Sequence, residues 1–368
     1  MLAITKPPET HRVLSINDSE EISKEAPLKT PAVSVVILNY NGRDVLPACM
    51  RSVYNSRDPN FEVIVVDNGS TDQSVEAAER DFPETIVIRN KKNLGFSIGN
   101  NIGIAQSKGK YIVLLNNDAV VHPDWLKELI KGAIQLNGGF CQPKILLMDD
   151  PKLINSVGNM IHLAGFGLCR GLGEPDTGQF EERVEIGYAS GACVFASRRA
   201  IEEIGLLDPV YFAYNEDTDW GWRGRMFGWK SFYIPTAVIY HEWSRFASRS
   251  RLKFYYLERN RIATLLKNYS DRTLILLLPI LLLSELAVIL YSLASGWLPE
   301  KIKGYVDLFK SRRNLMAKRR QLQAKRRFGD RVVMKVFVDE MKHFYLGSAI
   351  GPLNKILRLL RWIVTHYV

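Results

Sequence analysis

Short runs of aliphatic and β-branched residues alternate with segments of helical spacing along the first third of the chain. The strand-like runs cover residues 33–38, 61–66, 85–88 and 111–115, and the helix-like segments cover residues 43–56, 71–81 and 97–107. Continuous apolar runs of this length are typical of buried strands. Strands that alternate with helices through short connections predict an open, mostly parallel sheet with helices on both faces.

Polar residues follow three of these strands where each strand ends. They are Asn39-Tyr40-Asn41, Asp67-Asn68 and Asn116-Asn117-Asp118. In open α/β sheets, ligands bind outside the carboxyl ends of the strands, so a nucleotide is expected there. A single Asp after a strand is more often a turn former or a helix cap. Polar residues at three strand ends favour a ligand-binding site over three separate turns.

The sequence has no glycine-rich phosphate cradle, neither GxGxxG after the first strand nor GxxxxGK[ST]. The phosphates of a bound nucleotide would then be handled by a metal ion. Asp118 is the natural ligand, because a hard carboxylate suits Mg²⁺ or Mn²⁺.

A second candidate for chemistry lies between Tyr214 and Arg223, where Glu216, Asp217 and Asp219 stand among aromatic residues. Carboxyl groups that are partly desolvated and repel one another have raised pKa values, which suits a general base near neutral pH. The alternative is a helix N-terminus, where acidic residues interact favourably with the helix dipole.

Charge is concentrated late in the chain. Of 368 residues with a net charge of +10, Lys and Arg gather between positions 301 and 327, where Asp307 alone opposes them. Such a stretch predicts an anionic partner, either nucleic acid or a membrane leaflet, and a solvated basic helix is the alternative. The cysteines show no CxxC pair, which indicates reduced thiols that bind no metal. Residues 1–30 lack a signal-peptide pattern and are expected to form a flexible tail.

The segment 273–294 is apolar enough and long enough to cross a bilayer about 30 Å thick. Pro279 and Glu285 interrupt it, and a single crossing would place the basic stretch on the outer side, against the positive-inside rule. These features favour a re-entrant or in-plane helical hairpin that bends at Pro279; a single span and a buried soluble helix are alternatives. Residues 355–364 predict a basic amphipathic helix at a membrane surface, or one packed on the domain.

Several motifs in order resemble the family 2 glycosyltransferases, which are inverting enzymes of the GT-A fold. They lie at 33–41, 65–72, 93–101, 114–119, 190–192 and 215–223, followed by His241. The resemblance covers roughly residues 33–260 and is greatest to rhamnosyltransferase-type members. It implies a Rossmann-like mixed sheet, with a catalytic domain at 31–265, membrane-inserted or re-entrant helices at 266–300 and a basic membrane-surface region at 301–368.

The resemblance also implies roles for individual residues. Asp217 would be the general base, Asp118 and His241 would contact Mg²⁺ or Mn²⁺, and Arg223 would pair with Glu216 or Asp219 to support the loop. Tyr40 would stack on the donor base and Asp67 would hydrogen-bond it. The other residues expected to bind the nucleotide sugar are Asn39, Asn93, Gly95, Asn101, Asn117, Ser190 and Gly191. Asn116 replaces the first Asp of the usual Asp-x-Asp motif, so Asp118 alone supplies charge there.

Together these patterns predict transfer of a sugar from a UDP- or dTDP-sugar, with dTDP-rhamnose among the candidates, to a hydroxyl of a lipid-linked glycan. The enzyme would associate with a membrane, with its catalytic domain facing the cytoplasm. Two alternatives remain open: a nucleic-acid-binding protein that uses residues 301–327, and a catalytically silent nucleotide-sugar binder.

Overall fold

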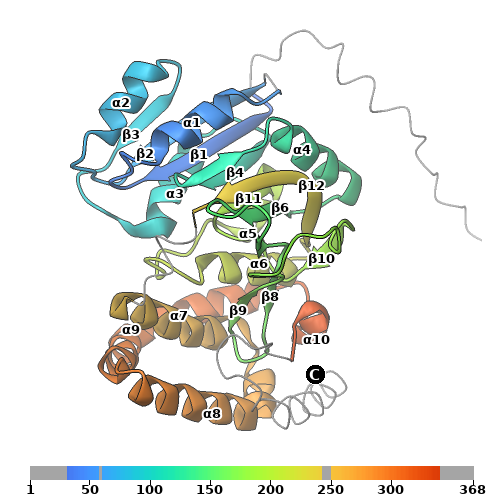
Figure 1. Cartoon of the computed structure of the whole chain (residues 1–368). Helices are drawn as coiled ribbons and strands as arrows, with labels where there is room; N and C mark the ends of the chain where they lie inside the picture. The colour runs from blue at the N-terminus through green and yellow to red at the C-terminus, as the bar shows by residue number, and fades with distance from the viewer. Residues whose placement is uncertain (1–30, 58–59, 243–249, 340–368) are drawn as a thin grey trace, which may run out of the picture.

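The computed structural model describes residues 31–57, 60–242 and 250–339 (Figure 1). The predicted flexible tail at 1–30 and the predicted amphipathic helix at 355–364 lie outside the described residues.

A sheet of ten strands forms the centre of the molecule, with the order β10-β12-β6-β11-β4-β1-β2-β3; β5 pairs with β12, and β7 pairs with β6. Its strands are β1 (Val33–Asn39), β2 (Phe61–Asp67), β3 (Ile86–Arg89), β4 (Tyr111–Asn116), β5 (Ala119–Val121), β6 (Phe140–Leu147), β7 (Ile154–Ser156), β10 (Val184–Ile186), β11 (Cys193–Ser197) and β12 (Ser231–His241). A separate hairpin pairs β8 (Asn159–Ile161) with β9 (Gly167–Cys169).

The four strands predicted from the apolar runs are confirmed, and they pair in parallel. Asn39 at the end of β1 is in register with Asp67 at the end of β2, and Leu38 is in register with Asn116 of β4. The polar strand ends therefore meet at one edge of the sheet. The other half of the sheet is mixed, because β11 runs antiparallel to both β4 and β6.

Helices cover both faces of this sheet, because successive strand residues point to opposite sides. Val35 and Ile37 pack with α1 (Leu46–Tyr54), α2 (Ser74–Asp81) and α4 (Trp125–Leu136). Val36 packs on the other face, with α3 (Gly95–Gln106), α5 (Arg198–Ile204) and α6 (Glu216–Met226). The predicted arrangement of helices on both faces is confirmed.

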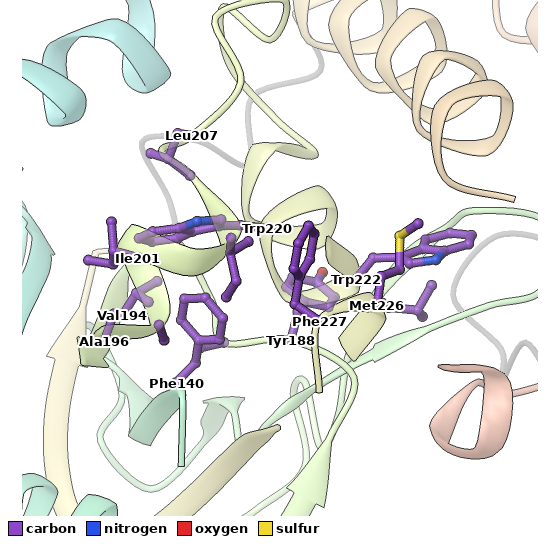
Figure 2. Close-up of a cluster of buried hydrophobic side chains, with 14 of the residues drawn as sticks. Phe140, Tyr188, Val194, Ala196, Ile201, Leu207, Trp220, Trp222, Met226 and Phe227 are labelled. Atoms are coloured by element: carbon purple, nitrogen blue, oxygen red, sulfur yellow. The ribbon is translucent and has the colours of Figure 1, made fainter. Parts of the chain in front are cut away.

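The aromatic residues near the acidic motif form core around α6 (Figure 2). Trp220 meets the ring of Phe140 at a centroid distance of 4.9 Å, and Trp222 meets that of Tyr269 at 4.6 Å, both edge to face. Such pairs add roughly 0.5–1.5 kcal/mol beyond the burial of their area. The first turn of α6 is therefore held rigidly at the edge of the core.

The C-terminal part is helical: α7 (Arg251–Asn268), α8 (Asp271–Ala294), α9 (Leu298–Lys325), α10 (Asp330–Val333) and a 3₁₀ turn at Met334–Val336. α7 packs along α9 and also contacts α6. The predicted boundary at residue 265 falls inside α7. Among the described residues, α8 is the one helix long and apolar enough to cross a membrane, with a mean hydropathy of 2.6.

The predicted hairpin bend at Pro279 is wrong, because α8 continues through this residue as one helix. Proline removes one hydrogen bond and can bend a helix without ending it when the flanking residues favour helix. The helix instead begins after Ser270, whose hydroxyl accepts a hydrogen bond from the Thr273 N–H at 3.2 Å, and ends at Ala294.

Part of the basic stretch is neutralised by carboxylates from elsewhere in the chain. Lys318 pairs with Asp208, Arg319 with Asp271 at 2.6 Å, and Arg327 with Glu203 at 2.9 Å. The sequence showed only the opposing charge within the stretch itself. The contacts to Asp208 and Glu203 fasten α9 and the segment after it to the sheet domain, and the contact to Asp271 joins α9 to α8.

Candidate active site

A cavity of about 1130 Å³ opens at the edge of the sheet where the polar strand ends meet. Its wall includes most of the predicted site residues: Tyr40, Asn93, Gly95, Asn117, Ser190, Gly191, Glu216, Asp217 and His241. The β8–β9 hairpin, α7 and α8 line its other end. This hairpin lies within a glycine-rich part of the chain, residues 140–190.

Three residues predicted to bind the nucleotide sugar, Asn39, Asp67 and Asn101, are not among the residues of the cavity wall, and each forms hydrogen bonds within the protein. Asn39 is fully buried; its amide donates to the Ser74 hydroxyl at 2.8 Å and its oxygen accepts from Asn117 at 2.8 Å. Asp67 accepts from the Ser70 N–H at 2.9 Å.

Asn101 forms two hydrogen bonds with the backbone of Leu207: its amide donates to the carbonyl at 2.7 Å, and its oxygen accepts from the N–H at 3.1 Å. This bond fixes the segment after α5 against α3. The binding roles of Asn39, Asp67 and Asn101 stay predictions.

Asn68 is a wall residue that the prediction of individual ligands missed. Its amide donates to the Asn93 side chain at 3.0 Å and to the Gly95 carbonyl at 3.2 Å, and its oxygen accepts from the Leu94 N–H at 3.0 Å. Its place directly after Asp67 at a strand end was the available signal. Asn116 also lines the wall.

Gly95 joins this half of the site to the loop before α6. It has a φ of +82°, and a Cβ there would lie 2.4 Å from the Phe212 carbonyl oxygen. The next N–H, that of Phe96, donates to the same oxygen at 2.6 Å. Only glycine fits this conformation and this close approach.

Asp217 stands in the first turn of α6 with its carboxylate on the cavity wall. One oxygen accepts from the Gly191 N–H at 2.9 Å, and the other accepts from the Thr218 N–H at 2.7 Å. Burial raises the pKa of Asp217, and these N–H donors offset only part of that rise. A positioned carboxylate with a raised pKa is suited to act as a general base.

Glu216 is more deeply buried than Asp217, with 6% of its surface exposed. Burial, and then the neighbouring charge of Asp217, raise the pKa of Glu216 well above its usual range. The rise in pKa is therefore larger for Glu216 than for Asp217, so Asp217 is the first of the pair to ionise as the pH rises.

A strained turn precedes α6 and sets the direction of its first residues. Tyr214 and Asn215 both have left-handed backbone, with φ of +68° and +69°. Such residues are uncommon outside glycine and persist only where surrounding contacts hold them. The buried amide of Asn260 on α7 supplies such contacts, donating to the carbonyls of Ala213 and Tyr214 at 2.8 and 2.7 Å.

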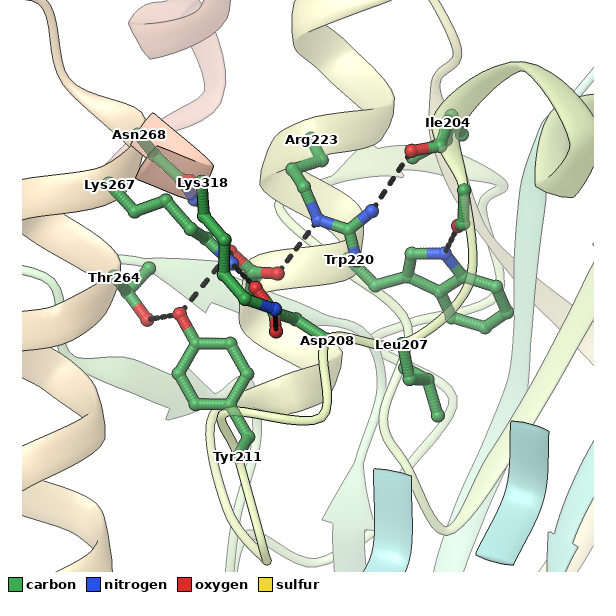
Figure 3. Close-up of polar contacts among 12 residues, drawn as sticks. Ile204, Leu207, Asp208, Tyr211, Trp220, Arg223, Thr264, Lys267, Asn268 and Lys318 are labelled. Atoms are coloured by element: carbon green, nitrogen blue, oxygen red, sulfur yellow. Dashed lines mark hydrogen bonds and ion pairs between the residues drawn. The ribbon is translucent and has the colours of Figure 1, made fainter. Parts of the chain in front are cut away.

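Asp219 is fully buried and is the shared partner of Arg223, Lys267 and Asn268, whose side chains are labelled in Figure 3. It pairs with Arg223 at 2.8 Å and Lys267 at 2.9 Å, and accepts from the Asn268 amide at 3.0 Å. Burial alone would raise the pKa of Asp219, but Lys267 and Arg223 lower it below its usual range. Of the two partners considered for Arg223, the structure selects Asp219. This cluster joins α6 to α7.

Asp118 and His241 lie together at the ends of neighbouring strands. The His241 Nε2 is 3.3 Å from an oxygen of Asp118, and its Nδ1 is 3.0 Å from the Asn155 amide oxygen. Asp118 is 3% exposed, and within the described part of the chain its carboxylate has no hydrogen-bond donor. The Nδ1 of His241 donates to the Asn155 oxygen, and its Nε2 faces the Asp118 carboxylate, which accepts no hydrogen bond from a described residue. This arrangement of a histidine and a carboxylate is suited to binding a divalent metal. No group of three or more such ligands is found among the described residues.

The mixed sheet, the strand-end cavity and the carboxylate at the start of α6 define a GT-A glycosyltransferase fold. A crystal structure of GalNAc-T7 with UDP, GalNAc and Mn²⁺ has the same fold: the match has a TM-score of 0.54 at 17% identity and covers 67% of this chain and 49% of that one.

Residues 34–205 match "Glycosyl transferase family 2"; the chain therefore contains a domain of this family and is a glycosyltransferase, as the motifs predicted. An N-acetylglucosaminyl-diphospho-decaprenol L-rhamnosyltransferase of Mycobacterium tuberculosis is 27% identical over 234 residues, which cover 58% of this chain and 76% of the relative. The low-salt glycan biosynthesis hexosyltransferase Agl10 of Haloferax volcanii is 25% identical over 200 residues, covering 52% and 61%.

Proposed function

We propose that the protein transfers a sugar from a nucleotide diphosphate sugar to a hydroxyl of a lipid-linked glycan, with inversion at the anomeric carbon. The observation that carries this proposal is the Asp217 carboxylate, held on the wall of a cavity that the polar strand ends also line. A base in this position meets the acceptor hydroxyl on the side opposite the donor.

The donor would lie along Tyr40, Asn68 and Asn93, with the ring of Tyr40 exposed for stacking on the base. A UDP- or dTDP-sugar is the proposed donor, and the names of the relatives favour a hexose or rhamnose as the sugar. Asp67 would recognise the N3–H that uracil and thymine share.

Asp118 and His241 would hold Mg²⁺ or Mn²⁺, and Asn155 would keep the imidazole in the required orientation. The divalent ion supplies positive charge that offsets the negative charge growing on the departing diphosphate. The Mn²⁺ bound to GalNAc-T7 supports a divalent metal and leaves open the choice between the two ions.

Asp217 takes the proton of the acceptor hydroxyl as that oxygen attacks the sugar. The Gly191 and Thr218 N–H groups fix its two oxygens, so its free lone pairs are directed before the acceptor arrives. The pKa of Glu216 beside it is raised further by burial and by the charge of Asp217, which disfavours a second negative charge. Because one displacement occurs without a covalent intermediate, the anomeric configuration inverts.

The acceptor is proposed to be lipid-linked because the mycobacterial relative acts on a decaprenol-linked sugar and because α8 is strongly apolar. The protein would lie on a membrane with its catalytic domain on the cytoplasmic side, where nucleotide sugars are made.

The test is donor turnover by the full chain with Mg²⁺ or Mn²⁺ across UDP-, dTDP- and GDP-sugars. Asp217→Asn should lower turnover by roughly 10²–10⁴-fold while donor binding is retained. Asp149→Asn, the same change at an exposed position, is the matched control and should leave turnover unchanged. Equal turnover by both variants would contradict the assignment of the base.

A further inference from the structure

The cavity that contains Asp217 extends well beyond the space that a nucleotide sugar needs. Its second arm runs between the β8–β9 hairpin, α7 and α8, and its wall there includes Ser284, Ala287, Val288 and Tyr291. These positions are three or four residues apart and therefore form one face of α8. On the α8 side the arm is walled by small and apolar side chains, and on the α7 side it also meets the buried ion pair of Glu258 and Arg261.

A positive group and an aromatic cluster mark the path from Asp217 into this arm. Lys253, in the first turn of α7, lies on the wall with its ammonium 5.8 Å from the centre of the Tyr214 ring. The next residue, Phe254, stacks on Trp297 at 4.7 Å, and Tyr291 lies 6.1 Å from the same indole. Along the wall, a carboxylate base is thus followed by a cation and then by apolar surface.

The opposite face of α8 is exposed and apolar. Its most exposed residues are Ile275, Leu278, Leu282, Leu286, Leu290 and Leu293. Large apolar side chains in contiguous rows mark a surface that meets another apolar phase. The cavity arm and the exposed face lie on opposite sides of α8. A molecule bound in the arm is therefore separated from the outer apolar phase by the width of this one helix.

We propose that this arm binds the hydrocarbon chain of a phosphate-linked lipid acceptor, with Lys253 beside the first phosphate and the inner face of α8 against the first carbons of the chain. This inference rests on the proposed function and identifies the acceptor's place in the same cavity. The order of groups matches such a molecule: its sugar hydroxyl meets Asp217, its phosphate meets Lys253, and its chain meets Val288 and Tyr291. Burial lowers the pKa of Lys253, and a bound anion would favour its charged form.

The test compares binding of farnesyl diphosphate with inorganic diphosphate, and dodecyl phosphate with inorganic phosphate, by the purified full chain. A buried methylene is worth roughly a factor of four in affinity, so a seated chain should add at least about 100-fold. A gain with both lipids assigns the arm to hydrocarbon in general, and a gain with one of them assigns the branched prenyl or the straight chain. No gain with either lipid would overturn the proposal.

A pair of variants on α8 locates the chain. Val288→Trp fills the arm and should weaken farnesyl diphosphate binding by roughly 10-fold or more, whereas Leu290→Trp on the exposed face should change it by less than about twofold. Binding of inorganic diphosphate should be equal in both. Equal weakening by the two variants would refute the location.

A measurement on the unaltered chain covers the case in which Val288→Trp does not fold. A photoreactive prenyl diphosphate should cross-link to the peptide that contains residues 284–291, and attachment elsewhere would overturn the proposal. If turnover needs Asp217 but binding does not depend on the hydrocarbon chain of the lipid, only this inference is refuted. If binding depends on the hydrocarbon chain but no turnover needs Asp217, the proposed function is refuted, and the assignment of the acceptor with it.

Discussion

The buried charge of Asp219 should be essential for stability, and Asp219→Asn measures its contribution. The carboxylate receives three donors within 3.0 Å: the Arg223 guanidinium, the Lys267 ammonium and the Asn268 amide. An asparagine oxygen can satisfy part of this set, but its amide hydrogens would face the cations and the buried positive charge would be uncompensated.

The expected loss of unfolding free energy depends on the partners that each cation retains in the variant. Breaking a buried ion pair costs about 3–5 kcal/mol. Arg223 retains two backbone carbonyls, those of Ile204 and Leu206, at 3.1 and 2.9 Å, and Lys267 retains Asp208 at 2.7 Å. The loss should therefore fall near the lower limit, about 3 kcal/mol, which lowers Tm by roughly 4 °C for a chain of this length.

The assay is urea and thermal unfolding of the full chain, followed by tryptophan fluorescence. Glu79→Gln is the matched control, since Glu79 binds Arg89 through two bonds of 2.6 Å but is 40% exposed. An exposed pair of this kind contributes about 1 kcal/mol or less. Equal destabilisation by both variants would refute the reasoning.

The dependence on pH gives a second check with a defined sign. The pKa of Asp219 is lower in the folded than in the unfolded chain. Its contribution is therefore fully present above the unfolded value of about 4 and is lost as the pH falls through the folded value. The Tm difference between wild type and Asp219→Asn should be constant from pH 6 to 8 and should shrink below about pH 4.

Three further outcomes are expected. Asn260→Ala removes both bonds that hold the turn at Tyr214, so kcat should fall by roughly 10-fold or more while donor Kd stays unchanged; an unchanged kcat would contradict this positioning role. Glu216→Gln should keep at least about a third of wild-type activity in a turnover assay, because the raised pKa of Glu216 favours its neutral form; a loss as large as that of Asp217→Asn would show that its charge is needed. Gly95→Ala should lower Tm by several degrees in a thermal melt, because its Cβ would meet a backbone oxygen at 2.4 Å, and an unchanged Tm would count against this contact.

The strands and their polar ends could be predicted because both signals are local. The run from Val33 to Leu38 is apolar except at Ser34, and the strand ends at Asn39, where the polar segment begins. Local pattern did not separate residues that face the cavity from those that hold it together. Asn39 and Asn68 have the same side chain and the same kind of position, yet the first is buried against Ser74 and the second lies on the wall.

Contacts over long separations also escaped prediction. Asn260 lies 46 residues after the Tyr214 carbonyl that it binds, in a helix whose sequence shows only mixed charge and apolar spacing. Its function depends on α7 crossing the loop before α6, which follows from packing of the whole domain. The same holds for Lys253, whose relation to Asp217 appears only when α7 is placed beside the cavity.

Glu285 shows how tertiary structure changes the meaning of a charge. In the sequence it stands inside an apolar segment and opposes contact with lipid. In the structure it pairs at 2.5 Å with Arg261 of α7 and at 2.5 Å with Lys301 of α9, on the protein side of α8. The carboxylate therefore fixes the rotation of α8 about its axis, with Ala287 and Val288 toward the cavity and the leucine row outward. The charge that opposed contact with lipid in the sequence is thus paired on the inner side of α8, and the outer face of the helix is apolar.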